Sequence, residues 1–181
     1  EQMKSLAQAK PLLIEEVDPL LHFYRNSGGN ISPKCRKDGE LVFTGEKKKL
    51  KAPLSVIVPV FLANDVSILY LKKLLQSIET SYPSVNEKLT FIFLDDGSPR
   101  NEMKDCLKAS GLFDRQDVRV SENPKNLGFV KTVNRGIELA GTGTDVVILY
   151  SNTEIHGPIF QILQHHAQIC SSTASITPLS N

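Results

Sequence analysis

The chain has 181 residues, of which 40% are apolar and 23% are charged, and its net charge is +1. This length suits one domain, or one domain with an extension, and the composition is that of a globular rather than a disordered protein. No apolar run approaches the roughly 18 residues that a membrane-spanning helix needs. The small net charge argues against a protein that binds nucleic acid.

The cysteines Cys35, Cys106 and Cys170 are far apart and form no C-x-x-C pair. This spacing argues against a disulfide framework or a zinc site and favours a reducing compartment, so we expect a cytoplasmic protein. The first ten residues do not have the pattern of a signal peptide. Because the sequence begins with Glu1 and stops after TPLSN, we expect it to be a piece of a longer protein.

Residues 1–53 are predicted to form an irregular N-terminal extension and linker. Apolar residues within 1–26 indicate one or two short helices, interrupted at prolines. Residues 41–44 indicate a short edge strand.

A lysine cluster closes this extension and consists of Lys47, Lys48, Lys49 and Lys51. Such a run is typical of a solvated linker. The alternative is a peripheral membrane contact with anionic lipid headgroups, at the inner face of the plasma membrane.

From residue 54 onward, short apolar runs alternate with helical patterns. Strands are expected at residues 54–60, 89–94, 118–120, 145–149 and 174–177. Helices are expected at residues 66–80, 102–109, 128–140 and 158–170. Strands and helices that alternate in this way require a parallel sheet with right-handed crossovers. The sequence therefore predicts an α/β fold over residues 54–181: a doubly wound, mostly parallel, Rossmann-like sheet with helices on both faces.

Two carboxylates and a glycine end the buried strand in the stretch LTFIFLDDGSPR, residues 89–100. In open α/β sheets the ligand crevice lies beyond the carboxyl ends of the strands. We therefore expect Asp95 and Asp96 at an exposed rim, where they accept hydrogen bonds from a ligand and where substitutions change stability little. A purely structural Asp-Gly turn is the open alternative.

Four groups of residues follow expected strand ends, so the sheet would bring them to one edge. They are Pro59-Val60-Phe61, Asp95-Asp96-Gly97-Ser98, Asn126-Leu127-Gly128-Phe129 with Asn134-Arg135-Gly136, and Tyr150-Ser151-Asn152-Thr153-Glu154. In this order and spacing, and with TPLSN at the end, they resemble the family 2 inverting glycosyltransferases of the GT-A fold. The N-L-G-F form is most similar to bacterial rhamnosyltransferase-like enzymes that build surface polysaccharides.

The resemblance implies a nucleotide-diphosphate sugar donor, a UDP- or dTDP-sugar, and a glycan or lipid-linked acceptor. It places nucleotide contacts at Pro59, Phe61, Asp95, Asp96, Asn126, Gly128 and Lys131. An aromatic ring at residue 61 would stack on the base, and a carboxylate at residue 95 or 96 would accept a hydrogen bond from the base or ribose. Asn126 and Gly128 would shape the turn before a helix whose first amides favour a diphosphate. For Lys131, a solvent-facing helix charge is the open alternative.

The resemblance also implies a divalent cation, Mn²⁺ or Mg²⁺, held by the last Asp of an Asp-x-Asp or Asn-x-Asp element. This chain has Tyr150-Ser151-Asn152 there, so the metal position carries an amide, which brings no charge to offset dehydration of the ion. Glu154 would lie on the same face if the strand continues, and it is the alternative ligand. The cofactor prediction is therefore weakened by the residues themselves.

The family's catalytic base is a carboxylate that deprotonates the acceptor hydroxyl, and the resemblance places it beyond residue 181. The chain is thus expected to be the donor-binding part of a hexosyl or deoxyhexosyl transferase. The alternative is a non-catalytic glycosyltransferase-like module that binds nucleotide or a partner, which Asn152 favours. A dinucleotide-binding Rossmann domain lacks support, because no G-x-G-x-x-G follows the first strand.

Overall fold

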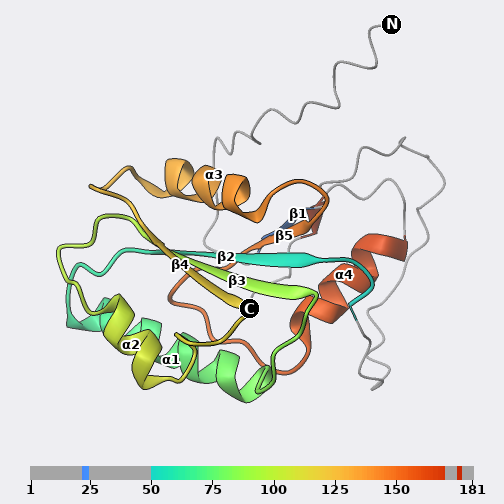
Figure 1. Ribbon diagram of the computed structural model, residues 1–181, viewed down its shortest axis with the longest axis horizontal. Helices are drawn as coiled ribbons and strands as arrows, with labels where there is room; N and C mark the ends of the chain where they lie inside the picture. Colours follow the sequence, from blue (N-terminus) through green and yellow to red (C-terminus); the bar gives the residue numbers. More distant parts are fainter. Residues whose placement is uncertain (1–21, 25–49, 170–174, 177–181) are drawn as a thin grey trace, which may run out of the picture.

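In the computed structural model, the described residues are 22–24, 50–169 and 175–176. They form a six-stranded sheet in the order β4-β3-β2-β5-β1-β6, with helices on both faces (Figure 1). The strands are β1 (His22–Tyr24), β2 (Leu54–Val60), β3 (Leu89–Asp95), β4 (Val118–Glu122), β5 (Asp145–Ile148) and β6 (Ser175–Ile176). The helices are α1 (Asp65–Ser81), α2 (Met103–Ala109), α3 (Phe129–Ala140) and α4 (Ile159–Ile169).

Strands β2 to β5 form the parallel part of the sheet. β2 pairs with β3 on one side and with β5 on the other, and β4 follows β3. The chain therefore moves outward from β2 to β4 and then returns to the opposite side of β2. Such a reversal of strand order is the place where open α/β sheets bind ligands. The predicted doubly wound α/β fold is confirmed.

The expected helix within residues 1–26 is wrong for residues 22–24, which form β1. This strand pairs antiparallel with β5, and β6 pairs antiparallel with β1. The physical reason is that the sequence HFY favours a strand once the edge of β5 offers unpaired backbone groups. The rest of that expected helix, the strand at 41–44 and Lys47 to Lys49 lie outside the described residues.

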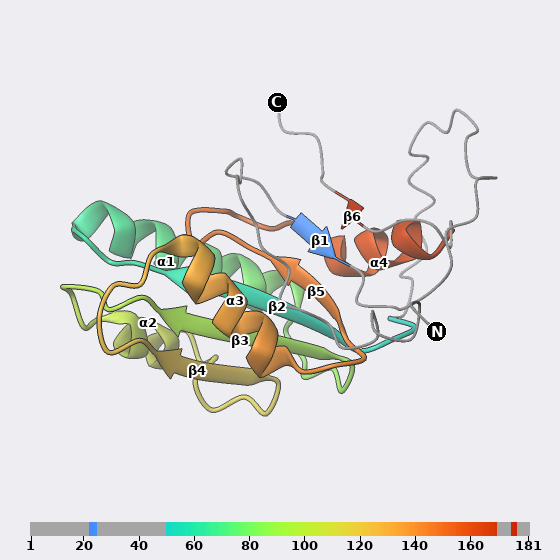
Figure 2. The same cartoon turned by 90° about the horizontal axis from the view of Figure 1, so that it is seen from above.

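Side-chain alternation along β2 divides the core between the two faces of the sheet. Val56 and Val58 join the larger cluster, which also takes residues of α1, α2 and α4. Ile57 points the other way and packs with Val133 of α3. Seen from above, α3 crosses the sheet on the face opposite to α1 and α2 (Figure 2). The β4–β5 crossover thus runs over one face and the two earlier crossovers run over the other.

The segment just before β2 is fixed by a buried glutamine of α4. The side chain of Gln164 is 1% exposed. Its Oε1 accepts a hydrogen bond from Lys51 N at 2.8 Å, and its Nε2 donates to Ala52 O and Asp145 Oδ2, each at 3.0 Å. The entry into β2 is therefore packed against α4. None of the described helices is both long and apolar enough to cross a membrane.

Gly136 lets α3 approach the sheet closely. A Cβ atom on this residue would overlap Ile57 Cγ2 and would lie 3.1 Å from Leu94 Cδ1. Ile57 is β-branched and fully buried in a central strand, so its side chain cannot rotate away. The glycine of the N-R-G sequence is therefore required by helix–sheet packing.

Gly136→Ala is expected to lower the free energy of unfolding by about 1 to 2 kcal/mol, because overpacking outweighs the better helix propensity of alanine. Urea unfolding followed by circular dichroism measures the change. Glu138→Ala, at an exposed position of the same helix, is the matched control and should be nearly neutral. Equal stability of the two variants would show that the sheet yields at Ile57.

Candidate functional site at the carboxyl edge of the sheet

The switch point between β2 and β5 leaves an aromatic ring exposed. Phe61 follows β2 directly and is 42% exposed, whereas the next residue, Leu62, is fully buried. Leu62 N donates a hydrogen bond to Ser98 Oγ at 2.8 Å, which ties the loop after β2 to the loop after β3. The backbone therefore presents Phe61 outward while Leu62 anchors the chain in the core.

Pro59 lies near the end of β2, where only one neighbouring strand remains. β2 pairs with β5 from Leu54 to Ile57, and from there on with β3 alone. A proline in a central strand normally removes a hydrogen bond from the ladder. At this position no β5 partner exists, so the proline fits without that loss and stiffens the approach to Phe61.

Asp95 closes the turn after β3 and is buried, with 7% exposure. Its Oδ1 accepts a hydrogen bond from Ser98 N at 2.7 Å, an Asx-type turn. Its backbone carbonyl accepts from Asn123 N at 2.8 Å. Within the described parts of the chain, no donor reaches the second carboxylate oxygen of Asp95, which leaves an acceptor at the sheet edge. The expected exposed rim position is wrong for this residue, because the turn folds over it.

Asp96 is also buried, and its carboxylate binds the loop before α3. Oδ1 accepts hydrogen bonds from Thr132 Oγ1 at 2.6 Å, Asn123 Nδ2 at 2.8 Å and Leu127 N at 2.8 Å. Oδ2 accepts from Gly128 N at 3.0 Å. The expected exposed position of Asp96 is therefore wrong, since both oxygens are engaged inside the protein. The side chain organises the loop that carries other predicted site residues.

The electrostatics of Asp96 follow from these contacts. Burial opposes the charged form, but hydrogen bonds from Thr132, Leu127, Asn123 and Gly128 outweigh it and hold the pKa of Asp96 below its ordinary value. The carboxylate is therefore charged at neutral pH. A buried carboxylate with four donors is stable as an anion because each donor replaces a water molecule.

Asn123, Thr132 and Arg135 complete this network, and the sequence reasoning gave the first two no role. Asn123 Nδ2 also donates to Thr132 Oγ1 at 2.7 Å, and its Oδ1 accepts from the Arg135 guanidinium. Arg135 donates further to Glu122 O at 2.8 Å. Thr132 is fully buried on the sheet side of α3, next to Val133 and Gly136. The sequence did carry a signal for Thr132: it is a polar residue at a position where the helical pattern expects an apolar side chain.

Asn126 and Gly128 shape the turn into α3. Asn126 is exposed, and its Oδ1 accepts a hydrogen bond from Gly128 N at 2.9 Å. Gly128 has φ +85°, a left-handed conformation that favours glycine. The amides of Leu127 and Gly128 are occupied by Asp96, so the helix offers only later first-turn amides to a ligand. Lys131 lies in that first turn and is exposed.

The segment after β5 does not continue as a strand. Thr153 N donates to Tyr150 O at 3.1 Å, which closes a turn, so the expected common face of Asn152 and Glu154 is wrong. Tyr150 stacks on Phe129 of α3, with ring centroids 4.9 Å apart and ring planes 11° from parallel. Asn152 is exposed at the turn.

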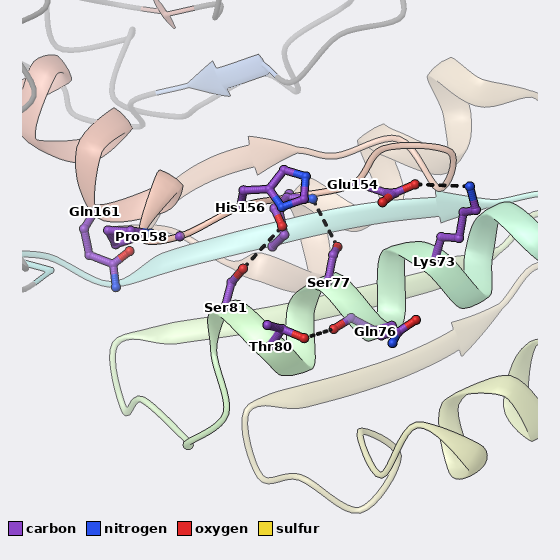
Figure 3. Close-up of a pocket in the computed structure, with 11 residues that line it drawn as sticks. Lys73, Gln76, Ser77, Thr80, Ser81, Glu154, His156, Pro158 and Gln161 are labelled. Atoms are coloured by element: carbon purple, nitrogen blue, oxygen red, sulfur yellow. Dashed lines mark hydrogen bonds and ion pairs between the residues drawn. The ribbon is translucent and has the colours of Figure 1, made fainter.

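Glu154 turns away from this edge, toward α1. Its Oε1 lies 3.5 Å from Lys73 Nζ. The two side chains stand at one end of a cavity of about 660 Å³ between α1 and the segment after β5 (Figure 3). Farther along, Ile155 N donates to Ser77 Oγ at 3.1 Å, and Ser81 Oγ donates to Ile155 O at 3.3 Å. These bonds fix the segment along α1.

The donor set near Asn152 does not fit a divalent cation. A hard cation prefers several anionic oxygens, and the described residues contain no group of three or more His, Cys, Asp or Glu side chains that could hold a metal. Asn152 is an amide, Glu154 is paired with Lys73, and Asp96 has no free oxygen. The predicted metal ligands Asn152 and Glu154 are therefore not brought together.

The family comparison agrees with this geometry. Residues 55–150, more than half of the chain, match the family described as glycosyl transferase family 2. The chain belongs to this family. No curated protein matches the sequence.

Solved structures resemble the chain in fold. A mannosyltransferase from Pyrobaculum calidifontis, PcManGT, solved with GDP-Man and Mn²⁺, has 14% sequence identity and a TM-score of 0.53, over 66% of this chain and 33% of its own. TarS (residues 1–349) from S. aureus, solved with UDP, has 20% identity and a TM-score of 0.51, over 65% and 32%. The chain thus spans about a third of the length of these proteins, and its fold is that of family 2 enzymes with the GT-A architecture.

Proposed function

We propose that this chain is the donor-binding part of a glycosyltransferase, and that the nucleotide lies across the switch point between β2 and β5. The observation that carries the proposal is Phe61, an aromatic ring held 42% exposed at that point by the burial of its neighbour Leu62. An exposed aromatic ring at a ligand-binding edge is a surface on which a base stacks. Family 2 membership and the GDP-Man and UDP complexes of the similar structures support a nucleotide-sugar ligand.

In this proposal the remaining site residues contact different parts of the nucleotide. The second oxygen of Asp95 accepts a hydrogen bond from the base or ribose, as a carboxylate does well. Asn126 and Gly128 shape the wall of the site, and Lys131 faces the diphosphate. Asp96, first predicted as a direct contact, acts by holding the 123–128 loop in place.

The reaction proposed for the whole protein is transfer of a hexosyl or deoxyhexosyl group from a UDP- or dTDP-sugar, with inversion, to a glycan or lipid-linked acceptor. Residues 54–181 would be the nucleotide-sugar-binding domain, and the catalytic base would lie in the acceptor-binding half. A rhamnosyltransferase-like specificity, in bacterial polysaccharide synthesis at the cytoplasmic face of the membrane, is the version that the N-L-G-F form favours. The lysines before β2 would contribute the membrane contact.

Phe61→Ala is expected to weaken UDP or dTDP binding about tenfold, because base–aromatic stacking contributes roughly 1 to 3 kcal/mol. Calorimetric titration with UDP, dTDP, GDP and CDP measures the affinity and identifies the preferred base. Tyr70→Ala is the matched control, since Tyr70 is an equally exposed aromatic on α1, 44% exposed. It should bind as the unchanged chain does.

Equal losses of nucleotide affinity in Phe61→Ala and Tyr70→Ala would show that the effect of Phe61→Ala is not specific to the switch point. Absence of binding with all four nucleotides, up to millimolar concentration, would contradict the proposed function.

A second candidate function is a non-catalytic module that binds nucleotide or a protein partner. The observation that favours it is Asn152, an amide at the position where the family resemblance implies a metal-binding Asp. The full-length protein distinguishes the two candidates. Release of UDP from UDP-sugars in the presence of an acceptor supports the enzyme, whereas tight binding without turnover supports the module.

A further inference from the structure

The residues after β5, Tyr150 to Glu154, determine whether a metal ion can balance the negative charge of the diphosphate. A structure of similar fold was solved with Mn²⁺, yet the residues around Asn152, where the family resemblance implies the ion, do not fit a divalent ion. The ring of Tyr150 stacks on Phe129, and Asn152 carries no charge.

Of the carboxylates Asp95, Asp96 and Glu154, the proposed function already assigns the free oxygen of Asp95 to the base or ribose, which leaves Glu154 and Asp96 to replace the missing ligand. Glu154 stands beside Lys73 on α1, on the far side of the turn closed by Thr153 N and Tyr150 O. Asp96 accepts four hydrogen bonds from its own protein, so a metal would have to displace them. Asp96 would have to give up these hydrogen bonds to bind an ion beside Asn152, and Glu154 would have to leave Lys73.

The first turn of α3 provides a positive charge at the same edge of the sheet. Lys131 belongs to the first turn of α3, and the first residue of this helix, Phe129, stacks its ring on Tyr150, so the start of α3 contacts the segment after β5. Among the residues described by the structure, Lys131 forms no ion pair and no hydrogen bond through its ammonium group. An exposed ammonium is able to bind a phosphate oxygen as a point charge.

We propose that this chain binds its nucleoside diphosphate without a divalent cation, and that Lys131 supplies the positive charge beside the diphosphate. The inference rests on the proposed function and deepens it, because it specifies what the nucleotide brings to the site: a diphosphate that is not complexed with metal. The stacked pair of Phe129 and Tyr150 holds the lysine-bearing first turn of α3 against the segment after β5.

The first experiment titrates the 181-residue chain with UDP by calorimetry, once in EDTA and once in excess Mn²⁺. We expect the Kd for UDP to differ by less than about twofold between the two conditions. The protein side chains near Asn152 would add little to the binding of Mn²⁺ by the phosphates of UDP alone. Mn²⁺ alone, followed by its paramagnetic resonance signal, should show no binding to the chain. Tightening of UDP binding by about tenfold or more in Mn²⁺ would overturn the inference.

Variants identify the groups involved. Lys131→Gln should weaken UDP binding about tenfold in EDTA, because it removes a charge-assisted hydrogen bond to a phosphate oxygen. Lys131→Arg should restore most of the affinity. Lys72→Gln, an exposed lysine of α1 without an ion pair among the described residues, is the matched control and should bind normally. Equal affinity of Lys131→Gln and the unchanged chain would overturn the role of Lys131.

Asn152→Asp returns a carboxylate without changing side-chain size, and it should create a Mn²⁺ dependence of UDP binding that the unchanged chain lacks. If the unchanged chain already needs Mn²⁺ and Glu154→Gln removes that need, Glu154 is the ligand and the inference fails while the proposed function stands. Absence of UDP binding in every condition would overturn both. Thermal unfolding of each variant, followed by circular dichroism, confirms that it is folded.

Discussion

Asp96→Ala is expected to lower the free energy of unfolding by about 3 to 5 kcal/mol, because it leaves several buried donors without an acceptor at once. The donors are Thr132 Oγ1, Asn123 Nδ2, Leu127 N and Gly128 N. The net stability of a domain is typically only about 5 to 15 kcal/mol. The variant should therefore unfold at clearly lower denaturant concentration, as measured by urea titration with circular dichroism detection.

Asp95→Ala is the comparison that isolates the network. Asp95 is equally buried, but its side chain accepts one hydrogen bond, from Ser98 N. Its loss should cost about 1 kcal/mol. If Asp95→Ala and Asp96→Ala had similar free energies of unfolding, the two carboxylates would contribute equally to stability. This result would contradict the structural role of Asp96.

The pH dependence gives a second readout for Asp96. Its pKa is lower in the folded protein than in an unfolded chain, where an Asp has a pKa of about 3.9. Its contribution to stability is therefore complete at neutral pH and is lost as the pH falls through the folded-state pKa. The difference in unfolding free energy between the unchanged chain and Asp96→Ala should shrink over this acidic range.

Local patterns were enough to predict most of the fold. The strands at β2 and β3 are apolar runs between turn residues, and the helix at α1 has its apolar residues on one face, so each can be recognised from neighbouring residues alone. β1 was missed because its pairing with β5 joins Phe23 to Val147. A three-residue strand carries no periodicity, and only its distant partner determines its structure.

The same limit explains the error at the two adjacent carboxylates. Asp95 and Asp96 are neighbours with the same side chain, so no local pattern distinguishes them. The partners of Asp96 lie 27, 31, 32 and 36 residues away along the chain. Only the folded crossover from β4 to α3 brings these groups to its carboxylate. By contrast, the exposed position of Phe61 was predictable because the apolar strand ends directly before it.

Gly97→Ala is expected to disrupt the nucleotide edge more than the same substitution at any other glycine that the structure describes. Gly97 has φ +63°, and a Cβ atom there would overlap the backbone of Lys125 and Asn126, with Lys125 Cα at 2.7 Å. Backbone atoms cannot rotate away as a side chain does, so the 123–128 loop must move. The left-handed conformation costs about 1 kcal/mol and the overlap about 1 to 3 kcal/mol more.

Gly111→Ala separates these two causes. Gly111 has a similar φ of +73°, but no atom lies within 4 Å of the added Cβ. Its variant should lose about 1 kcal/mol of unfolding free energy through backbone strain alone and should keep nucleotide affinity. Gly97→Ala should lose more stability and should also weaken UDP binding, since the displaced loop carries Asn126 and Gly128. Urea unfolding and calorimetric titration of both variants measure the two effects. Matching results for the two glycines would mean that the 125–126 backbone yields freely, and that the close approach of Gly97 does not position the site.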